Sequence, residues 1–456
     1  MIFNQTEFLF VFLPLTLAAF FAPGLRAMRP YTLLTTSLLF YGVSGIEHAA
    51  VLAIEVVWVY ALTRPLRAAG SRLLLTLAVL PPALALLHYK YLGFVVRTLI
   101  GAGISADETF SLFKATLLPA GISFFTFNLI SFAIDRYRGE IPEMPPFRRF
   151  ALFIMFFPHL VAGPILRYRD VADGLARLKE FTLRNGEAAV AIGYICLGLA
   201  AKVLIADTLG RIVDPMAHAP GTLPPAGAAY VMFAYSFQIY FDFYGYSLVA
   251  IGLASLFGIR FPRNFARPYE ARNPRDFWRR WHMTLSYWIR DYLYLPLGGN
   301  ARYVRNILIV FALCGLWHGA GWNFVVWGLY HAGLVIAYHF GRTGWDRLPN
   351  LAQIAATFVL VSLGWTLFLF DFDGAQALIQ SLLGLGAATG PSPTAEHWVL
   401  LLLAALACFA VYPEAMAERK THRAAADYAR TAAFAVLFVA TLLFLDRSQD
   451  FIYFRF

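Results

Sequence analysis

The segment ILIVFALCGLWHGAGWNFVVWGLYHAGLVIAYHF at residues 307–340 contains no Asp, Glu, Lys or Arg. Its flanks are basic on both sides, with Arg302 and Arg305 before it and Arg342 and Arg347 after it. Because basic residues gather at cytoplasmic membrane boundaries, the segment is predicted to enter the membrane and return. Only about a dozen residues precede His318, and a helix of that length rises about 18 Å. His318 is therefore predicted to lie at membrane depth, near the Gly-Ala-Gly turn.

The composition places the whole chain in a membrane. Of its 456 residues, 59% are hydrophobic and only 14% are Asp, Glu, Lys or Arg, whereas a soluble domain carries about 25% charged residues. The charges are gathered into short stretches between long apolar runs, as in polytopic membrane proteins. We therefore expect an all-α integral membrane protein with roughly 11 spanning helices by span length, forming one membrane-embedded domain over residues 1–456.

The formal net charge is +10, from 37 Lys and Arg against 27 Asp and Glu. A nucleic-acid-binding protein would carry these basic residues on a solvated face, with aromatic residues free to stack. Here they lie between apolar runs, which favours positive-inside topology and argues against nucleic acid as a partner. Cys196, Cys314 and Cys408 lie in apolar segments without C-x-x-C spacing, so neither a disulfide framework nor a zinc site is predicted.

The first apolar run, Phe8 to Ala22, is predicted to be a retained span with its N-terminus outside, in the periplasm. A cleaved signal has positive charge ahead of its apolar region, whereas this run is preceded by Glu7 and followed by basic residues. Basic clusters then recur at alternate boundaries, and the loop near Asp107 and Glu108 is expected outside. The clusters are Arg26 and Arg29; Arg64, Arg67 and Arg72; and Arg136, Arg138, Arg148 and Arg149.

The apolar segment Phe150 to Leu166 breaks this alternation, because basic residues follow it as well as precede it. It contains Pro158, Gly163 and Pro164 and is barely long enough to cross a hydrocarbon core of about 30 Å. We predict a re-entrant segment that lines a cavity, since irregular backbone at membrane depth must be covered by protein or face water. The alternative is an ordinary span that ignores the charge rule locally.

The most basic region, Arg260 to Arg305, is predicted to lie at the inner membrane surface. Its apolar residues recur at spacings of 3 to 4, which is typical of an amphipathic helix. A basic helix with a tryptophan face lies along a membrane interface, and the alternative is that it only anchors the chain to anionic lipid. The face consists of Phe277, Trp278, Trp281, Leu285 and Trp288. Further spans are expected near residues 185–206, 227–257, 354–370, 397–411 and 431–445.

Ionisable residues inside a membrane are functional candidates because their burial is costly. A neutral imidazole at His318 is suited to act as a general base near pH 7, although a histidine hydrogen-bonded between helices is an equal alternative. His282 follows Arg279 and Arg280, where a cytosolic anion could be held, unless it is a surface histidine at the lipid interface. Asp135 and Asp242, at the end of or within apolar runs, leave a secondary transporter open as an alternative. Motifs of hydrolases, metalloproteases and nucleotide-driven pumps are absent from the sequence.

Six stretches make the chain resemble the membrane-bound O-acyltransferase family, in particular its bacterial branch typified by the membrane subunit of alginate O-acetylation. The resemblance extends over nearly the whole chain. The stretches are LPAGISFFTF (118–127), FPHLVAGPI (157–165), QIYFDFYGYS (238–247), RNPRDFWRRWHMTLSYWIRDYLYLPLGG (272–299), LWHGAGWNFVVWGLYH (316–331) and FIYFRF (451–456).

The resemblance implies a multipass acyltransferase with spanning, re-entrant and interfacial helices around a central tunnel. The two family histidines match His318 and His282, and the same motifs supply Arg279, Arg280, Asp291, Trp317 and Asn323 as candidates for binding substrate or donor. Family members take acetyl groups from a cytoplasmic donor, generally acetyl-CoA, and deliver them across the inner membrane. A periplasmic or membrane-anchored transferase of the SGNH type, with a Ser-His-Asp site, usually places the group on a polysaccharide. The resemblance implies neither a metal nor a bound cofactor.

This resemblance suggests a mechanism in which His318 takes the proton of an acceptor hydroxyl while His282 positions or polarises the acyl group. The chain departs from the alginate-type pattern FSGYSD, because Tyr244 and Leu248 replace a small hydroxyl and an acid. The departure leaves the acceptor open among alginate, cellulose, peptidoglycan, another exopolysaccharide or a small secreted molecule. Two alternatives remain: D-alanyl transfer from a carrier-protein thioester to a cell-wall polymer, and a transporter or channel without chemistry.

Overall fold

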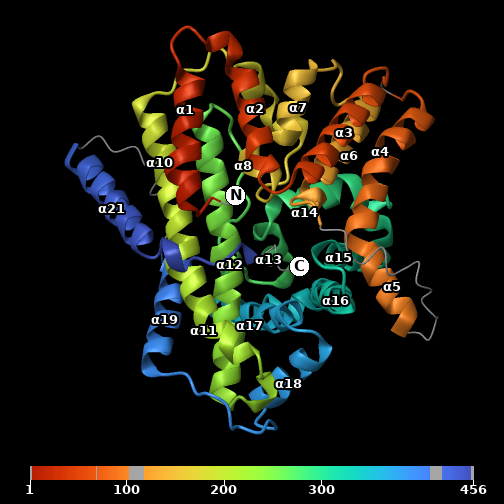
Figure 1. Ribbon diagram of the computed structural model, residues 1–456. Helices are drawn as coiled ribbons and strands as arrows, with labels where there is room; N and C mark the ends of the chain where they lie inside the picture. The colour runs from red at the N-terminus through yellow and green to blue at the C-terminus, as the bar shows by residue number, and fades with distance from the viewer. Residues whose placement is uncertain (1–2, 68, 102–117, 411–423, 453–456) are drawn as a thin grey trace. The chain divides into compact units, whose positions relative to one another are not determined.

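A computed structural model of the protein describes residues 3–67, 69–101, 118–410 and 424–452. Every regular element within these ranges is a helix, which confirms the predicted all-α class (Figure 1). The expected outer loop at Asp107 and Glu108, the end of the predicted span at Val411, and residues 453–456 of the terminal motif lie outside the described residues.

Six described helices are long and apolar enough to cross a membrane. They are Ile46–Thr63 (α3), Arg72–Leu99, which joins α4 to most of α5, Asn185–Ala217 (α10 to α11), Pro225–Leu256 (α12), Trp322–Trp345 (α16) and Asn350–Leu369 (α17). Shorter apolar helices occupy Phe8–Phe21, Ala395–Phe409 and Ala429–Leu443. The polytopic class is therefore confirmed, and the number of roughly 11 spans stays a prediction.

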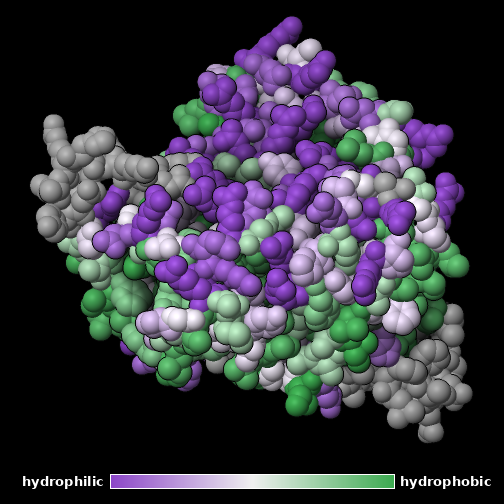
Figure 2. Space-filling model, turned by 90° about the horizontal axis from the view of Figure 1, so that it is seen from above, coloured by the Kyte–Doolittle hydropathy of each residue, from purple (hydrophilic) through white to green (hydrophobic). Residues whose placement is uncertain are grey.

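Large apolar side chains are exposed along these helices, as expected where lipid replaces water as the solvent. Ile46, Leu351 and Leu443 are 84%, 78% and 76% exposed. Figure 2 shows hydrophilic residues gathered on the face seen from above and hydrophobic residues towards its margins. Cys196, Cys314 and Cys408 are all buried and free, as expected from the absence of a disulfide pattern.

Contacts divide the chain into two compact units, Met1–Ala191 with Ala250–Pro262, and Ile192–Val249 with Arg263–Phe456. The first unit contains Leu13–Phe21 (α1), Arg29–Gly42 (α2), α3, Arg72–Leu86 (α4), Leu92–Gly101 (α5), Ile122–Arg138 (α6), Phe147–Met155 (α7), Phe157–Leu160 (α8) and Tyr168–Ala176 (α9). Asn185–Ala200 (α10) begins in the first unit and continues into the second.

Two basic boundaries of the first unit meet in the structure. The guanidinium of Arg136, at the end of α6, donates to the carbonyl oxygens of Leu66 and Pro142, the latter at 2.9 Å. The backbone N–H of Ala69 donates to the carbonyl oxygen of Tyr137 at 2.9 Å. The boundary after α3 therefore lies beside the boundary after α6, which agrees with the prediction that both occupy one side of the membrane.

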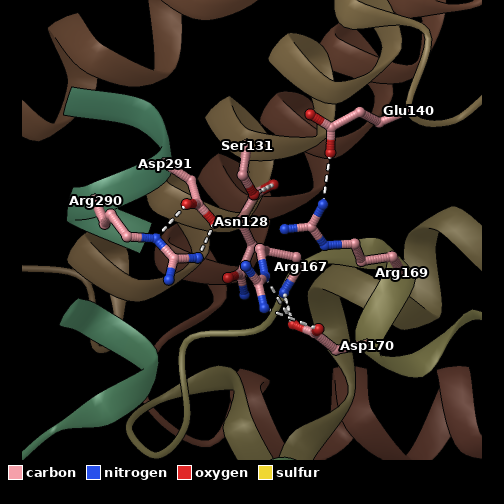
Figure 3. Close-up of polar contacts among 8 residues, drawn as sticks. All are labelled: Asn128, Ser131, Glu140, Arg167, Arg169, Asp170, Arg290 and Asp291. Carbon is pink, nitrogen blue, oxygen red and sulfur yellow. Dashed lines mark hydrogen bonds and ion pairs between the residues drawn. The ribbon is translucent and has the colours of Figure 1, made fainter. Parts of the chain in front are cut away.

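The segment Phe150 to Leu166 is broken and buried throughout. α7 ends at Met155, and α8 consists of four residues only, so neither helix reaches about 30 Å. Beyond the two ends of this segment, Glu140 and Arg169 form an ion pair at 2.6 Å (Figure 3). The chain therefore returns to the place from which it entered, which supports the re-entrant segment and not the ordinary span.

The second unit contains the other helices. After the π-helical turn Ala201–Ala206 they are Asp207–Ala217 (α11), α12 as far as Val249, Pro274–Arg280 (α13), Met283–Ile289 (α14), Tyr303–His318 (α15), α16, α17, Phe372–Leu382 (α18), Ala395–Ala410 (α19) and Ala424–Leu443 (α21). The end of α12, from Ala250 to Leu256, belongs to the first unit. In Figure 1, α12 runs beside α10 and α11. The backbones approach closely there, because a Cβ at Gly198 would lie 2.5 Å from the carbonyl oxygen of Gly245.

The predicted amphipathic helix through Phe277 and Trp288 is wrong as a single element. Two helices of seven residues, α13 and α14, replace it, and the chain breaks at Trp281 and His282. His282 has φ +44° in the left-handed region. Phe277, Trp281 and Leu285 are at most 3% exposed, so protein covers them instead of lipid. These apolar residues recur at spacings of 3 to 4 because they are buried in a protein core. A helix with one face in a core has the same period of apolar residues as a helix at a membrane interface.

A charged cluster is buried where α10, α11 and α12 meet. Lys202 Nζ lies 2.6 Å from Asp207 Oδ1 and 2.6 Å from Asp242 Oδ1. The C-terminal segment joins the cluster, because the N–H of Ile452 donates to Asp242 Oδ2 at 3.0 Å and Lys202 donates to the carbonyl oxygen of Asp450. Asp242, considered above as a transport site, is thus paired with a lysine that also holds the end of the chain.

Replacing Lys202 with Met should destabilise the protein by about 3–5 kcal/mol, because two carboxylates would remain buried without their cation. Thermal unfolding in detergent would report the loss as a lower midpoint temperature. The double variant Lys202→Met with Asp242→Asn should recover part of it. An unchanged midpoint in the single variant would contradict this assignment of the cluster.

α15 and α16 form a tight helical hairpin through two glycines. A Cβ at Gly315 would lie 2.1 Å from the carbonyl oxygen of Phe324, and one at Gly328 would lie 2.1 Å from that of Phe311. No side chain fits at either distance, so these glycines allow the two backbones to approach. The segment of residues 307–340 therefore turns back on itself as predicted.

Gly328→Ala should push α15 and α16 apart and lower the free energy of unfolding by about 1–3 kcal/mol, the usual range for overpacking. Gly333→Ala is the matched control in the same helix, because a Cβ there would meet nothing within 4 Å. This control should be neutral or stabilising by up to about 1 kcal/mol. Equal unfolding midpoints for the two variants would show that the close approach does not exist.

Candidate active site

A cavity of about 240 Å³ opens among α13, α14, α15 and α16, all in the second unit. Figure 1 shows these helices close together in the teal part of the chain. The polar residues of its lining are Arg275, Arg279, His282, Ser286, Arg290, Tyr294, Asn300, Tyr303 and His318. Its apolar lining includes Trp278, Leu285, Ile307, Val310, Phe311 and Cys314.

The cavity leads from a cationic rim to two buried histidines. Arg275, Arg279 and Arg290 are exposed, whereas His282 and His318 are only 1% and 3% exposed. No Asp or Glu is among the described residues of the lining. The positive potential of the rim therefore favours an anionic ligand, whose other end would approach the two imidazoles.

His318 is the last residue of α15, immediately before the turn to α16. Its ring lies among aromatic rings, with centroids 5.0 Å from Trp317, 5.1 Å from Trp327 and 5.4 Å from Phe368. The following Gly319 permits this arrangement, because a Cβ there would lie 2.1 Å from the ring of Phe324. His318 thus lies at the C-terminal end of α15, beside the turn to α16 and among aromatic rings, and its depth in the membrane stays a prediction.

His282 lies in the break between α13 and α14 and is held by Asn264. Its Nδ1 is 3.0 Å from Asn264 Oδ1, and the N–H of Met283 donates to the carbonyl oxygen of Asn264 at 2.8 Å. The edge of the ring also contacts Phe243, with centroids 4.7 Å apart. The prediction of a surface histidine at the lipid interface is therefore wrong, because this side chain is enclosed by protein.

Burial sets the protonation of His282. The residue lies outside the membrane-spanning helices, and desolvation lowers its pKa to about 3, because a buried imidazole is more stable without charge. The ring is therefore neutral at physiological pH. A neutral imidazole presents one N–H and one lone pair, so one of its nitrogens donates a hydrogen bond and the other is able to accept a proton.

The C-terminal segment supports the wall behind His282. Phe451 stacks on Tyr246 at 4.5 Å and contacts Phe243 at 5.8 Å, and Phe243 in turn contacts the imidazole. The residues that depart from the alginate-type pattern, Tyr244 and Leu248, are buried on α12 and do not line the cavity. The departure therefore changes the packing of α12 and not the described lining.

Of the residues expected to bind substrate, Arg279 lines the cavity and four others do not. Arg280 is paired with Asp276 at 3.0 Å, and Asp291 with Arg290 at 2.7 Å (Figure 3). Trp317 is buried between the two histidines, with ring centroids 6.2 Å from His282 and 5.0 Å from His318. Asn323 donates to the carbonyl oxygens of Leu367 and Phe370, so it joins α16 to the end of α17.

Sequence reasoning missed Arg275, Arg290, Tyr294, Asn300 and Tyr303 as lining residues. All five lie in or next to the basic region that was assigned to the membrane surface. The sequence feature that pointed to this region was the excess of positive charge just before an uncharged segment. These residues come together at the cavity because the chain turns before α15. The described residues contain no group of three or more His, Cys, Asp or Glu suited to holding a metal ion.

The sequence was compared with known proteins. The family model described as MBOAT, membrane-bound O-acyltransferase family, matches residues 71–369. The chain is 38% identical to the probable alginate O-acetylase of Pseudomonas syringae pv. tomato, covering 81% of this chain and 72% of the relative. It is 32% identical to the peptidoglycan O-acetyltransferase of Helicobacter pylori, over 85% and 81%. It is also 32% identical to the teichoic acid D-alanyltransferase of Bacillus subtilis, over 54% and 68%.

The match to the family model, over residues 71–369, includes all the helices that form the cavity, from α13 to α16. The family match and the named relatives agree with the resemblance of the sequence motifs and favour an enzyme over a transporter without chemistry. The chain therefore belongs to the membrane-bound O-acyltransferase family, and it is an acyltransferase.

Proposed function

We propose that this protein transfers acetyl groups from acetyl-CoA on the cytoplasmic side of the inner membrane towards a cell-surface or secreted polysaccharide. The observation that carries the proposal is the cavity that joins three exposed arginines to two buried histidines. Its rim offers charge to the phosphates of the donor, and its inner end offers imidazoles to the reacting thioester. Its volume of about 240 Å³ favours a short acyl group.

The reaction needs a base and no further activation of the donor. A thioester is already reactive, so a hydroxyl that loses its proton to an imidazole is able to attack the carbonyl carbon. His282 and His318 are the candidates for this role because they line the same cavity. The apolar lining and the aromatic rings around His318 exclude water, which limits hydrolysis of the donor.

The acceptor is proposed from the names of the relatives, and the partner from what the family resemblance implies. Relatives similar over most of the chain are named for alginate and for peptidoglycan, which supports a bacterial polysaccharide as the final acceptor. We propose an N-terminus in the periplasm, and an SGNH-type acetyltransferase there that receives the group. D-alanyl transfer is the second candidate, supported by a relative that matches 54% of this chain.

His318→Ala and His282→Ala should each lower kcat for acetyl transfer by about 10²–10⁴-fold, the usual contribution of a positioned acid or base. The measurement is release of CoA thiol from acetyl-CoA by the purified protein in liposomes with an acceptor polysaccharide. His218→Ala is the matched control, because His218 is an exposed histidine that does not line the cavity. Full activity in both cavity variants would contradict this site.

Arg279→Gln should raise KM for acetyl-CoA about tenfold, or about 1.4 kcal/mol, with a small change in kcat. The reason is that the guanidinium would bind the donor and not the reacting atoms. Acetyl-pantetheine lacks the phosphates, so its KM should not respond to the substitution. Arg347→Gln, outside the cavity lining, is the control. An equal effect on both donors would show that Arg279 does not bind phosphate.

The choice of donor separates acetyl from D-alanyl transfer. Wild-type protein in liposomes should consume acetyl-CoA without any carrier protein. Turnover that requires a carrier protein charged with D-alanine, with none on acetyl-CoA, would favour the second candidate.

A further inference from the structure

A second cavity lies in the first unit, at the place where the boundary after α3 meets the boundary after α6. Its volume is about 340 Å³, and it shares no lining residue with the cavity of the candidate active site. Half of its lining residues are arginines and none of them is acidic, so the cavity is strongly cationic. The lining consists of Arg64, Arg67, Arg136, Gly139, Ile141 and Pro142.

Arg136 is buried in the wall of this cavity and is held by the backbone. It is 5% exposed, and its guanidinium donates to three neutral acceptors, the carbonyl oxygens of Leu66, Ile141 and Pro142. Within the described residues, no Asp or Glu forms an ion pair with Arg136. The positive charge is therefore buried without a counter-ion from the chain. Because an unpaired buried charge is costly, such a site favours an anion from outside.

Arg64 and Arg67 make the cavity accessible from the surface. Both side chains are exposed, and Arg64 directly follows the last residue of α3. The acidic residues near α6 lie outside the lining, and Glu140 is already paired with Arg169 at 2.6 Å. These acidic residues are Asp135, Glu140 and Glu143. Three guanidinium groups around one space suit a phosphate group, because a guanidinium donates to phosphate oxygens through a planar fork.

An exposed apolar stripe on α3 leads to the same cavity. Ile54, Val57 and Trp58 are exposed, and their spacing of three and four residues places them on one face of the helix. Arg64 lies on this face too, because it comes seven residues after Val57, or about 10 Å along the helix axis. Trp58 also joins α3 to α4, since its Nε1 donates to the carbonyl oxygen of Leu77 at 2.8 Å.

We propose that this cavity binds the phosphate group of an anionic phospholipid, whose acyl chains lie along the exposed face of α3. An apolar helix face that ends at a basic cavity offers one surface to each half of such a lipid. The phosphate supplies the charge that Arg136 lacks, and it links the end of α3 to the end of α6. This inference goes beyond the proposed function, because it concerns another cavity and needs no acetyl-CoA.

The test is a titration of the full-length protein in detergent with dihexanoyl-phosphatidylglycerol, followed by native mass spectrometry. We expect one lipid to bind in preference to others. The double variant Arg64→Gln with Arg67→Gln should raise its Kd about tenfold or more, because two charge-assisted contacts are lost. Both residues are exposed, so the substitutions should not impair folding. Arg136 is left unchanged because its contacts hold the backbone.

The double variant Arg26→Gln with Arg72→Gln is the matched control. It removes the same charge from two exposed arginines of the basic boundaries, and neither lines the cavity. Its Kd should equal that of the wild type. An equal loss of affinity in both double variants would overturn the proposal, because it would mean that the lipid responds only to the overall surface charge.

Two further probes separate the possible sources of the phosphate group. Dihexanoyl-phosphatidylcholine has a phosphate but no net charge, so it should bind more weakly than the phosphatidylglycerol. Inorganic phosphate should compete poorly, because it lacks acyl chains. Inorganic phosphate that binds as tightly as the lipid, and depends on Arg64 and Arg67, would overturn the lipid and assign the cavity to a soluble phosphate compound.

Thermal unfolding of the wild-type protein tests the proposal without any variant. A ligand that binds the folded state raises the midpoint temperature, so dihexanoyl-phosphatidylglycerol should raise it more than the phosphatidylcholine does. Equal midpoints with the two lipids would overturn the proposal, even if the Arg64 and Arg67 variant failed to fold. A protein that did not use acetyl-CoA would contradict the proposed function and leave this result unaffected.

Discussion

The site depends on the hydrogen bond between Asn264 and His282. It joins a residue just after α12 to the break between α13 and α14, 18 residues later. The left-handed conformation of His282 ends one helix and lets the next begin at Met283. The same contact fixes the direction of the imidazole. The contact between Asn264 and His282 therefore links the break in the backbone to the orientation of the imidazole.

The surroundings explain why this pair is kept polar in an apolar protein. A buried amide and a buried imidazole are each costly when unpaired, and their hydrogen bond satisfies His282 Nδ1 and Asn264 Oδ1. Thr284 and Ser247 complete the set of contacts around the amide. On the other side of the ring, Phe243 is supported by the C-terminal segment, which Lys202 and Asp242 hold. The end of the chain thus contributes to the wall of the site.

Much of this fold was predictable from charge and hydropathy alone. The turning segment at residues 307–340 and the broken segment at Phe150 to Leu166 both follow from basic residues on either side of an apolar run. The place of His318 beside the turn between α15 and α16 followed from the Gly-Ala-Gly sequence after it, whereas its depth in the membrane stays a prediction. These features depend on local sequence and on the constant thickness of a membrane.

The remaining features of the site depend on contacts between distant residues. The spacing from Phe277 to Trp288 fits one helix on a membrane as well as two short helices in a core, and only the contact with Asn264 distinguishes them. No motif marked Asn264, because a single asparagine before an aromatic residue has no signal of its own. Arg290, Tyr294 and Asn300 reach the cavity through the turn before α15, which the sequence pattern does not reveal.

If the cavity is the active site, it holds an acyl donor with its phosphates at the arginines and its acyl group at the histidines. The most direct test is a cryo-electron microscopy structure of the protein with a thioether analogue of acetyl-CoA. We expect phosphate density within about 3.5 Å of Arg275, Arg279 or Arg290, with the acyl end beside His282 and His318. Density for the nucleotide outside this cavity, or an acyl end in contact with neither histidine, would contradict it.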